Sequence, residues 1–177
     1  MVRERGRGKY SGDYERDSSG EYRYKGERYR SKASPGLRAL CAMEAAALAA
    51  AFVLAGLMDN AASRIVYIAL PYAASALPIA FIAADVFKIL LHRSDLTRRQ
   101  YDGSVGQLGK AAPAALLMSV IAAAGDTVFL LTRLPSRGRT EEFLFLALCA
   151  VMAALSGHLT ALQRRIRDAY KRVPPEL

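Results

Sequence analysis

The chain has 177 residues, of which 53% are apolar and 23% are charged, and its formal net charge is +9. This length holds one domain and leaves no room for a soluble domain beside four membrane helices. The basic excess would favour nucleic acid in a soluble protein, but with long apolar stretches it indicates a cytoplasmic membrane surface. Cys41 and Cys149 lie inside apolar stretches without a Cys-x-x-Cys motif, so we expect packing residues rather than a disulfide or zinc site.

Residues 1–36 form a polar segment that is rich in Arg, Gly, Ser and Tyr and contains almost no aliphatic residues. Such a segment buries too little apolar surface to fold alone, so we predict a disordered, basic, Tyr-rich cytoplasmic tail. Tyrosines alternate with charges in EYRYKGERYR, a pattern that would suit base stacking. Because six acidic residues are mixed in, we favour contact with anionic lipid headgroups and expect no nucleic acid.

The first apolar stretch predicts a helix over about 37–58. A membrane-spanning helix needs roughly 20 mostly apolar residues, and after Arg38 this stretch is interrupted by Glu44 alone. Its helical stripe continues through Ala47, Ala51 and Ala55 at spacings of three and four, and such small residues let another helix approach closely. Glu44 is therefore expected to face a neighbouring helix rather than lipid.

The second predicted helix, over about 64–91, returns antiparallel to the first because the link between them is short. Pro71, Pro78 and Asp85 are spaced by seven residues and therefore share one face of the helix. The two prolines free backbone carbonyls that must find partners inside the protein, so this face is expected to point inward. Lys88 follows Asp85 within one turn.

Residues 92–109 form the longest internal link, in which Gln100–Gly103 is expected to be a turn. The third predicted helix spans about 110–132. Pro113 is tolerated in its first turn, and Asp126 belongs to its polar stripe.

The fourth predicted helix spans about 141–163 and starts at Thr140, followed by the acids Glu141 and Glu142. A stripe of small residues lies beside His158 on this helix. It consists of Ala150, Ala154, Gly157 and Ala161. Residues 166–177 are predicted to be a short, basic cytoplasmic tail.

The distribution of basic residues predicts the orientation. With the N-terminus inside, the segments 1–38, 88–110 and 164–177 hold 21 of the 25 Lys and Arg, and the outer side holds four. We therefore predict an all-α, multi-pass protein of the cell (plasma) membrane with both termini cytoplasmic. Its four transmembrane helices, within residues 37–165, are expected to form an antiparallel bundle behind the disordered tail.

Ionisable residues inside the predicted helices define a candidate intramembrane polar site. At about 1.5 Å per residue, three of its members lie roughly 9–10 Å from the cytoplasmic edge of the hydrocarbon core, and Lys88 lies one helical turn closer to that edge. They are Glu44, Asp85, Lys88 and His158. Asp126 stands apart near the outer edge, where Arg64 or Arg133 is expected to reach it. Charges at this depth cost about 2.5–3.5 kcal/mol each, so they usually pair or line a cavity.

Two interpretations of these residues remain open. In the structural one, Asp85 and Lys88 neutralise each other on one helix, while Glu44 binds His158 as a packing clasp. In the functional one, Glu44 and His158 form a proton or cation site. A metal or catalytic site is the weakest interpretation. Ser156 and His158 are two residues apart on a helix and point to different sides, so they form no nucleophile–base pair.

These considerations predict a non-enzymatic membrane protein without cofactor or metal. Its expected role is that of an accessory subunit or scaffold that packs against other membrane helices in a homo- or hetero-oligomer. The alternative is a small proton- or cation-coupled transporter that acts as a homo-oligomer through Glu44, Asp85 and His158. The expected non-protein partner is the lipid bilayer, with anionic headgroups held by the basic tails.

Overall fold

The computed structural model describes residues 13–16, 20–91, 95–132 and 139–173. The protein is mostly helical (81%), as predicted. Four helical stretches are long and apolar enough to cross a membrane, and between 28% and 33% of the most apolar window of each is buried. Most of each window is therefore at least partly accessible at the surface of the protein. These stretches are Pro35–Gly56, Val66–Leu91, Arg98–Thr132 and Thr140–Ala169. The disorder predicted for residues 1–12 and 17–19 lies outside the described residues.

The first helix, α1 (Pro35–Gly56), begins two residues earlier than predicted. Ser34 caps it, because its side chain accepts a hydrogen bond of 3.2 Å from the backbone nitrogen of Leu37, and Pro35 occupies the first helical turn. The sequence Ser34-Pro35-Gly36 therefore starts the helix.

The second stretch is a pair of helices, α2 (Val66–Ala74) and α3 (Ala76–Leu91), preceded by the 3-10 turn η2 (Ala62–Arg64). The break at Ser75 follows from Pro78, which cannot donate a hydrogen bond to the carbonyl four residues before it. Ser75 stabilises the break, because its hydroxyl donates to the carbonyl of Tyr72 at 2.6 Å.

The third stretch begins earlier than predicted. The helix α4 (Arg98–Tyr101), the π-helical segment η3 (Asp102–Gly106) and α5 (Gln107–Thr132) follow one another directly, so the turn expected at Gln100–Gly103 is helical. The start is a capping box, in which Gln100 Oε1 accepts from the Thr97 nitrogen at 2.9 Å and Thr97 Oγ1 accepts from the Gln100 nitrogen. Pro113 consequently lies inside α5.

The last helix, α6 (Arg139–Ala169), continues past the predicted end. Leu159, Leu162 and Ile166 are spaced by three and four residues and are all buried, so the core-facing stripe extends beyond residue 163. The basic residues that we assigned to the C-terminal tail therefore lie partly on this helix.

The described parts of the tails and of the 92–109 link contain short strands, which the sequence did not predict. β1 (Tyr14–Arg16) pairs antiparallel with β2 (Tyr22–Tyr24). β3 (Arg28–Ser31) is the middle strand of a second antiparallel sheet, between β4 (Asp95–Thr97) and β5 (Tyr170–Val173). Three tyrosines cover this sheet. The rings of Tyr29 and Tyr101 stack at 4.2 Å, and Tyr101 meets Tyr170 edge-on at 5.5 Å.

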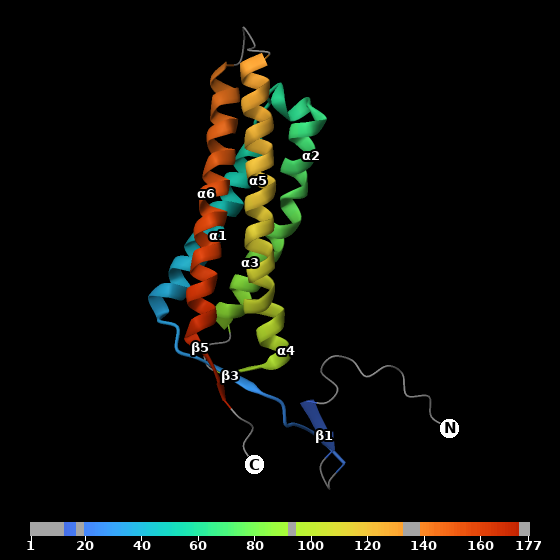
Figure 1. Cartoon of the computed structure of the whole chain (residues 1–177), viewed down its shortest axis with the longest axis vertical. Coiled ribbons are helices and arrows are strands. Elements are labelled where there is room, and N and C mark those ends of the chain that lie inside the picture. Colours follow the sequence, from blue (N-terminus) through green and yellow to red (C-terminus); the bar gives the residue numbers. More distant parts are fainter. Residues whose placement is uncertain (1–12, 17–19, 92–94, 133–138, 174–177) are drawn as a thin grey trace, which may run out of the picture.

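The second sheet takes one strand from each of the three basic segments, 1–38, 88–110 and 164–177, and joins them at one end of the molecule (Figure 1). α1 leaves this end, α3 returns to it, α4 and α5 leave it again, and α6 ends beside it (Figure 1). We call it the sheet end, and we call the opposite end, which carries the link between α1 and α2, the far end. Buried side chains from α1, α3, α5 and α6 form the larger hydrophobic core.

Candidate functional site

The candidate polar residues near the sheet end form two pairs. Glu44 on α1 contacts His158 on α6, with 2.5 Å between Oε1 and Nδ1. Asp85 and Lys88 form an ion pair within α3, with 2.9 Å between Oδ1 and Nζ. The structure therefore brings together each predicted pair, one across two helices and one along a single helix.

The Glu44–His158 pair differs on its two sides. Glu44 lies in the buried stripe of α1, whereas 56% of the His158 side chain is exposed at the outer surface of the helices. Glu44 Oε1 takes the contact with the imidazole, and Oε2 is buried without a hydrogen-bond partner among the described residues. The pair joins α1 to α6, and its imidazole lies at the outer surface of the helices.

The Asp85–Lys88 pair connects α3 to the π-helical segment. Asp85 is fully buried, and the Lys88 ammonium also donates to the carbonyl of Gly103 at 2.9 Å. A π turn changes the register of backbone hydrogen bonding, so its carbonyls need other donors. Lys88 supplies one of them, and Asp85 offsets the charge of Lys88.

Gln163 supplies another donor to this segment, and the sequence analysis missed it. Its Nε2 donates to the carbonyl of Val105 at 3.2 Å. The amide fits because Gly109 has no side chain, and a Cβ at that position would lie 2.7 Å from Gln163 Nε2. The signal available in the sequence was a glutamine at helical spacing from the apolar residues Leu159 and Ile166.

The far end holds a second missed residue, Glu142. Its carboxylate is buried and accepts hydrogen bonds from the backbone nitrogens of Ala61 and Ala62, at 2.6 and 3.4 Å. Glu142 therefore binds the link between α1 and α2 to the start of α6. We had interpreted it only as part of a favourable helix start.

Asp126 on α5 is fully buried, and neither carboxylate oxygen has a hydrogen-bond partner among the described residues. The expected pairing with Arg64 is wrong, because Arg64 contacts Asp59 at 2.9 Å instead. The other expected partner, Arg133, lies outside the described residues.

Cys41 and Cys149 are buried thiols without a disulfide, in line with their predicted packing role. Within the described ranges, no group of three or more His, Cys, Asp or Glu side chains is arranged to hold a metal ion. The candidate residues near the sheet end therefore form separate pairs, one between α1 and α6 and one within α3.

Compared with known proteins, the chain matches no family model, no curated protein and no solved structure.

Proposed function

We propose that this chain is a non-enzymatic, multi-pass membrane protein that acts as an accessory subunit or scaffold of a membrane complex. In this proposal its four apolar stretches cross the membrane as an antiparallel bundle, with the sheet end in the cytoplasm. The exposed apolar surface of the helices supports the crossing of the membrane. The gathering of basic segments at one end supports the orientation.

The observation that carries the proposal is the direct contact between Glu44 and His158 across α1 and α6. A polar pair in direct contact serves as an interhelical clasp in a bilayer, where helix association relies on close packing and hydrogen bonds. Lys88, Gln163 and Glu142 are likewise engaged in hydrogen bonds to backbone groups of other segments. Polar groups that bind other segments of the chain stabilise the helix bundle, as a scaffold role requires.

The small residues on α6 supply the surface for a partner helix. On α5 the comparable stripe is turned inward, since Ala115 and Ala122 are buried. On α6, by contrast, Ala154 and Ala161 are exposed beside the half-buried Gly157. Exposed small residues at this spacing let another membrane helix approach the backbone closely.

A pulldown of the tagged, full-length protein in mild detergent tests the proposal. We expect a stoichiometric membrane partner that survives Glu44→Gln and is lost with Ala154→Leu. Ala84→Leu, at another exposed alanine on α3, is the matched control and should retain the partner. A protein that purifies without any partner, or one whose partner is indifferent to Ala154→Leu, would contradict the proposal.

A second candidate function is a proton- or cation-coupled transporter, and the exposure of His158 favours it. An exposed imidazole beside a carboxylate with one unpartnered oxygen can exchange a proton at the surface of the helices. In a homo-oligomer this surface would line the shared interface. Proton flux into liposomes that falls with Glu44→Gln, but not with Glu141→Gln on the exposed start of α6, would favour this candidate over the first.

A further inference from the structure

The corner where α1 and α6 meet the second sheet has a fixed backbone. The nitrogen of Lys32 donates to the carbonyl of Ala169 at 2.9 Å, and Ser31 pairs with Tyr170 across β3 and β5. The chain that leads from the sheet into α1 is therefore bound to the end of α6. This attachment sets Lys32 beside α6 although the two are far apart in the sequence.

Basic side chains are exposed at this corner. Lys32, which directly follows β3, and Arg165 on α6 are both exposed, and neither makes an ion pair with any residue that the structure describes. Several acids at the sheet end contact other bases. Glu27 pairs with Arg172, Asp95 with Arg30, and Asp168 with Arg167. Among the described residues, the positive charge of Lys32 and Arg165 is therefore not compensated by an ion pair.

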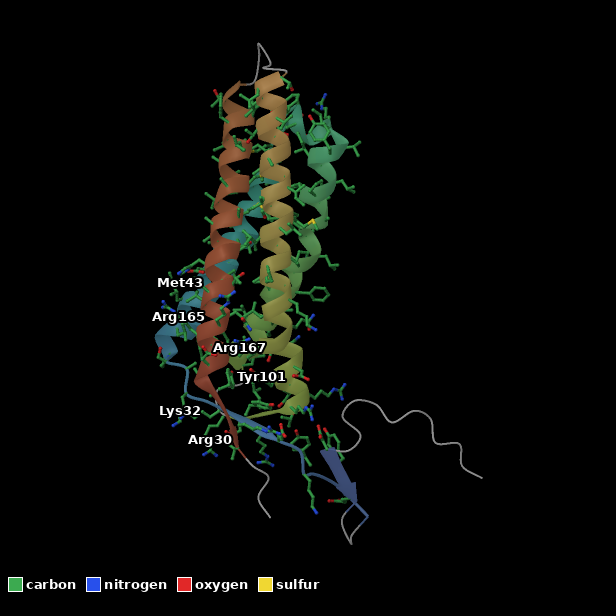
Figure 2. All side chains as sticks on the ribbon, viewed as in Figure 1. Arg30, Lys32, Met43, Tyr101, Arg165 and Arg167 are labelled. Carbon is green, nitrogen blue, oxygen red and sulfur yellow. The ribbon has the colours of Figure 1, made fainter. Side chains whose placement is uncertain are left out.

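Exposed apolar side chains lie directly above these bases. Met43 on α1 is 67% exposed and Leu40 is 39% exposed. Met43 lies eight residues into α1, which at about 1.5 Å per residue places it roughly 12 Å along the helix from Pro35. Figure 2 shows Met43, Arg165 and Lys32 in descending order along the same flank. Bases at the level of headgroups and apolar side chains at the level of acyl chains follow one another along this flank.

We propose that this corner is a binding site for one anionic phospholipid, with Lys32 and Arg165 on the phosphate and an acyl chain against Met43. Basic sites between membrane helices on the cytoplasmic side bind anionic headgroups in this way. The inference rests on the proposed membrane insertion, and it deepens it by naming a lipid class and a position. The bound lipid would fill the corner beside α1 and leave the upper part of the α6 stripe open.

Native mass spectrometry of the full-length protein in neutral detergent, titrated with phosphatidylglycerol, tests this site. The double variant Lys32→Gln/Arg165→Gln should weaken binding of the first lipid about thirty-fold, since each base near a headgroup contributes about five-fold. The matched control is Arg99→Gln/Lys110→Gln, which removes the same charge from exposed positions on α4 and α5. It should bind the lipid as the wild type does.

Equal losses in the two double variants would overturn the site, because they would show that only total charge matters. Glycerol phosphate, which lacks acyl chains, should bind far more weakly than phosphatidylglycerol, and comparable binding would likewise overturn the lipid assignment. Phosphatidylcholine should not replace the anionic lipid. If a membrane partner still copurifies while the lipid test fails, the scaffold proposal stands and only the lipid site falls.

Discussion

At the sheet end, the two buried acids of the helices lie beside basic side chains, Glu44 against His158 and Asp85 against Lys88. At the far end, Glu142 is held by two backbone N–H groups, and Asp126 has no partner among the described residues. The sheet end compensates its acids with side chains, whereas at the far end backbone N–H groups compensate Glu142 alone. The comparison predicts that the loss of a partnered acid, Glu142 or Asp85, destabilises the protein, whereas the loss of charge at Asp126 does not.

The largest effect is expected from Glu142→Ala at the far end. The substitution leaves the buried nitrogen of Ala62 and the nearby nitrogen of Ala61 without acceptors, which should lower the free energy of unfolding by about 3 kcal/mol. Glu141→Ala, an exposed neighbour on the same turn, is the control and should change little. Unfolding by denaturant in detergent micelles measures both, and equal losses would refute the clamping role of Glu142.

Conservative changes at the two buried aspartates should differ in sign. Asp85→Asn removes the charge that offsets Lys88 and should cost about 1 kcal/mol, since Lys88 is partly exposed. Asp126→Asn removes a buried acid that has no partner among the described residues, so stability should stay unchanged or rise by up to about 1 kcal/mol. The same unfolding assay compares them. A loss for Asp126→Asn as large as that for Asp85→Asn would mean that Asp126 has a partner outside the described residues.

A smaller effect is expected where α5 meets α6. Gly109→Ala forces Gln163 away from the carbonyl of Val105 and should cost about 1 kcal/mol for the lost hydrogen bond. Gly36→Ala, with no atom within 4 Å of the added carbon, should be neutral or slightly stabilising in its helix. Thermal unfolding of both variants checks the pair, and a neutral Gly109→Ala would argue against this contact.

The smallest expected effect concerns pH at the sheet itself. The Arg30 guanidinium, 3.0 Å from Asp95, holds the pKa of that carboxyl below its ordinary value. The contact between β3 and β4 therefore stabilises the fold above the ordinary pKa, and this contribution is lost as pH falls through the lowered pKa. In an NMR titration of Asp95, Arg30→Gln should move the midpoint upward, and an unchanged midpoint would contradict the pairing.

The sequence predicted the helices well because their signal is local. An apolar stretch of about 20 residues is enough to predict a membrane helix. The pair Glu44–His158 followed from the equal depth of the two residues in the membrane, and the pair Asp85–Lys88 from their spacing on one helix. The strands escaped prediction because β3 has four residues and pairs with segments that are far away in the sequence. Nothing in either neighbourhood indicates such a partner.

Other misses had a readable cause. The early start of α4 was encoded in the capping box of Thr97 and Gln100, which we had assigned to a link. The two prolines were expected to interrupt the second helix, and the break is found at Ser75, three residues before Pro78. The acceptor role of Glu142 depends on the path of the link between α1 and α2, which no local pattern specifies.

The central claim is that the helices cross a membrane with the sheet end in the cytoplasm. Single cysteines, introduced after Cys41→Ala and Cys149→Ala, test it with a membrane-impermeant maleimide. Asp59→Cys at the far end should react in intact cells, whereas Lys171→Cys on β5 should react only after permeabilisation. Reaction of both in intact cells, or the reverse pattern, would contradict the account.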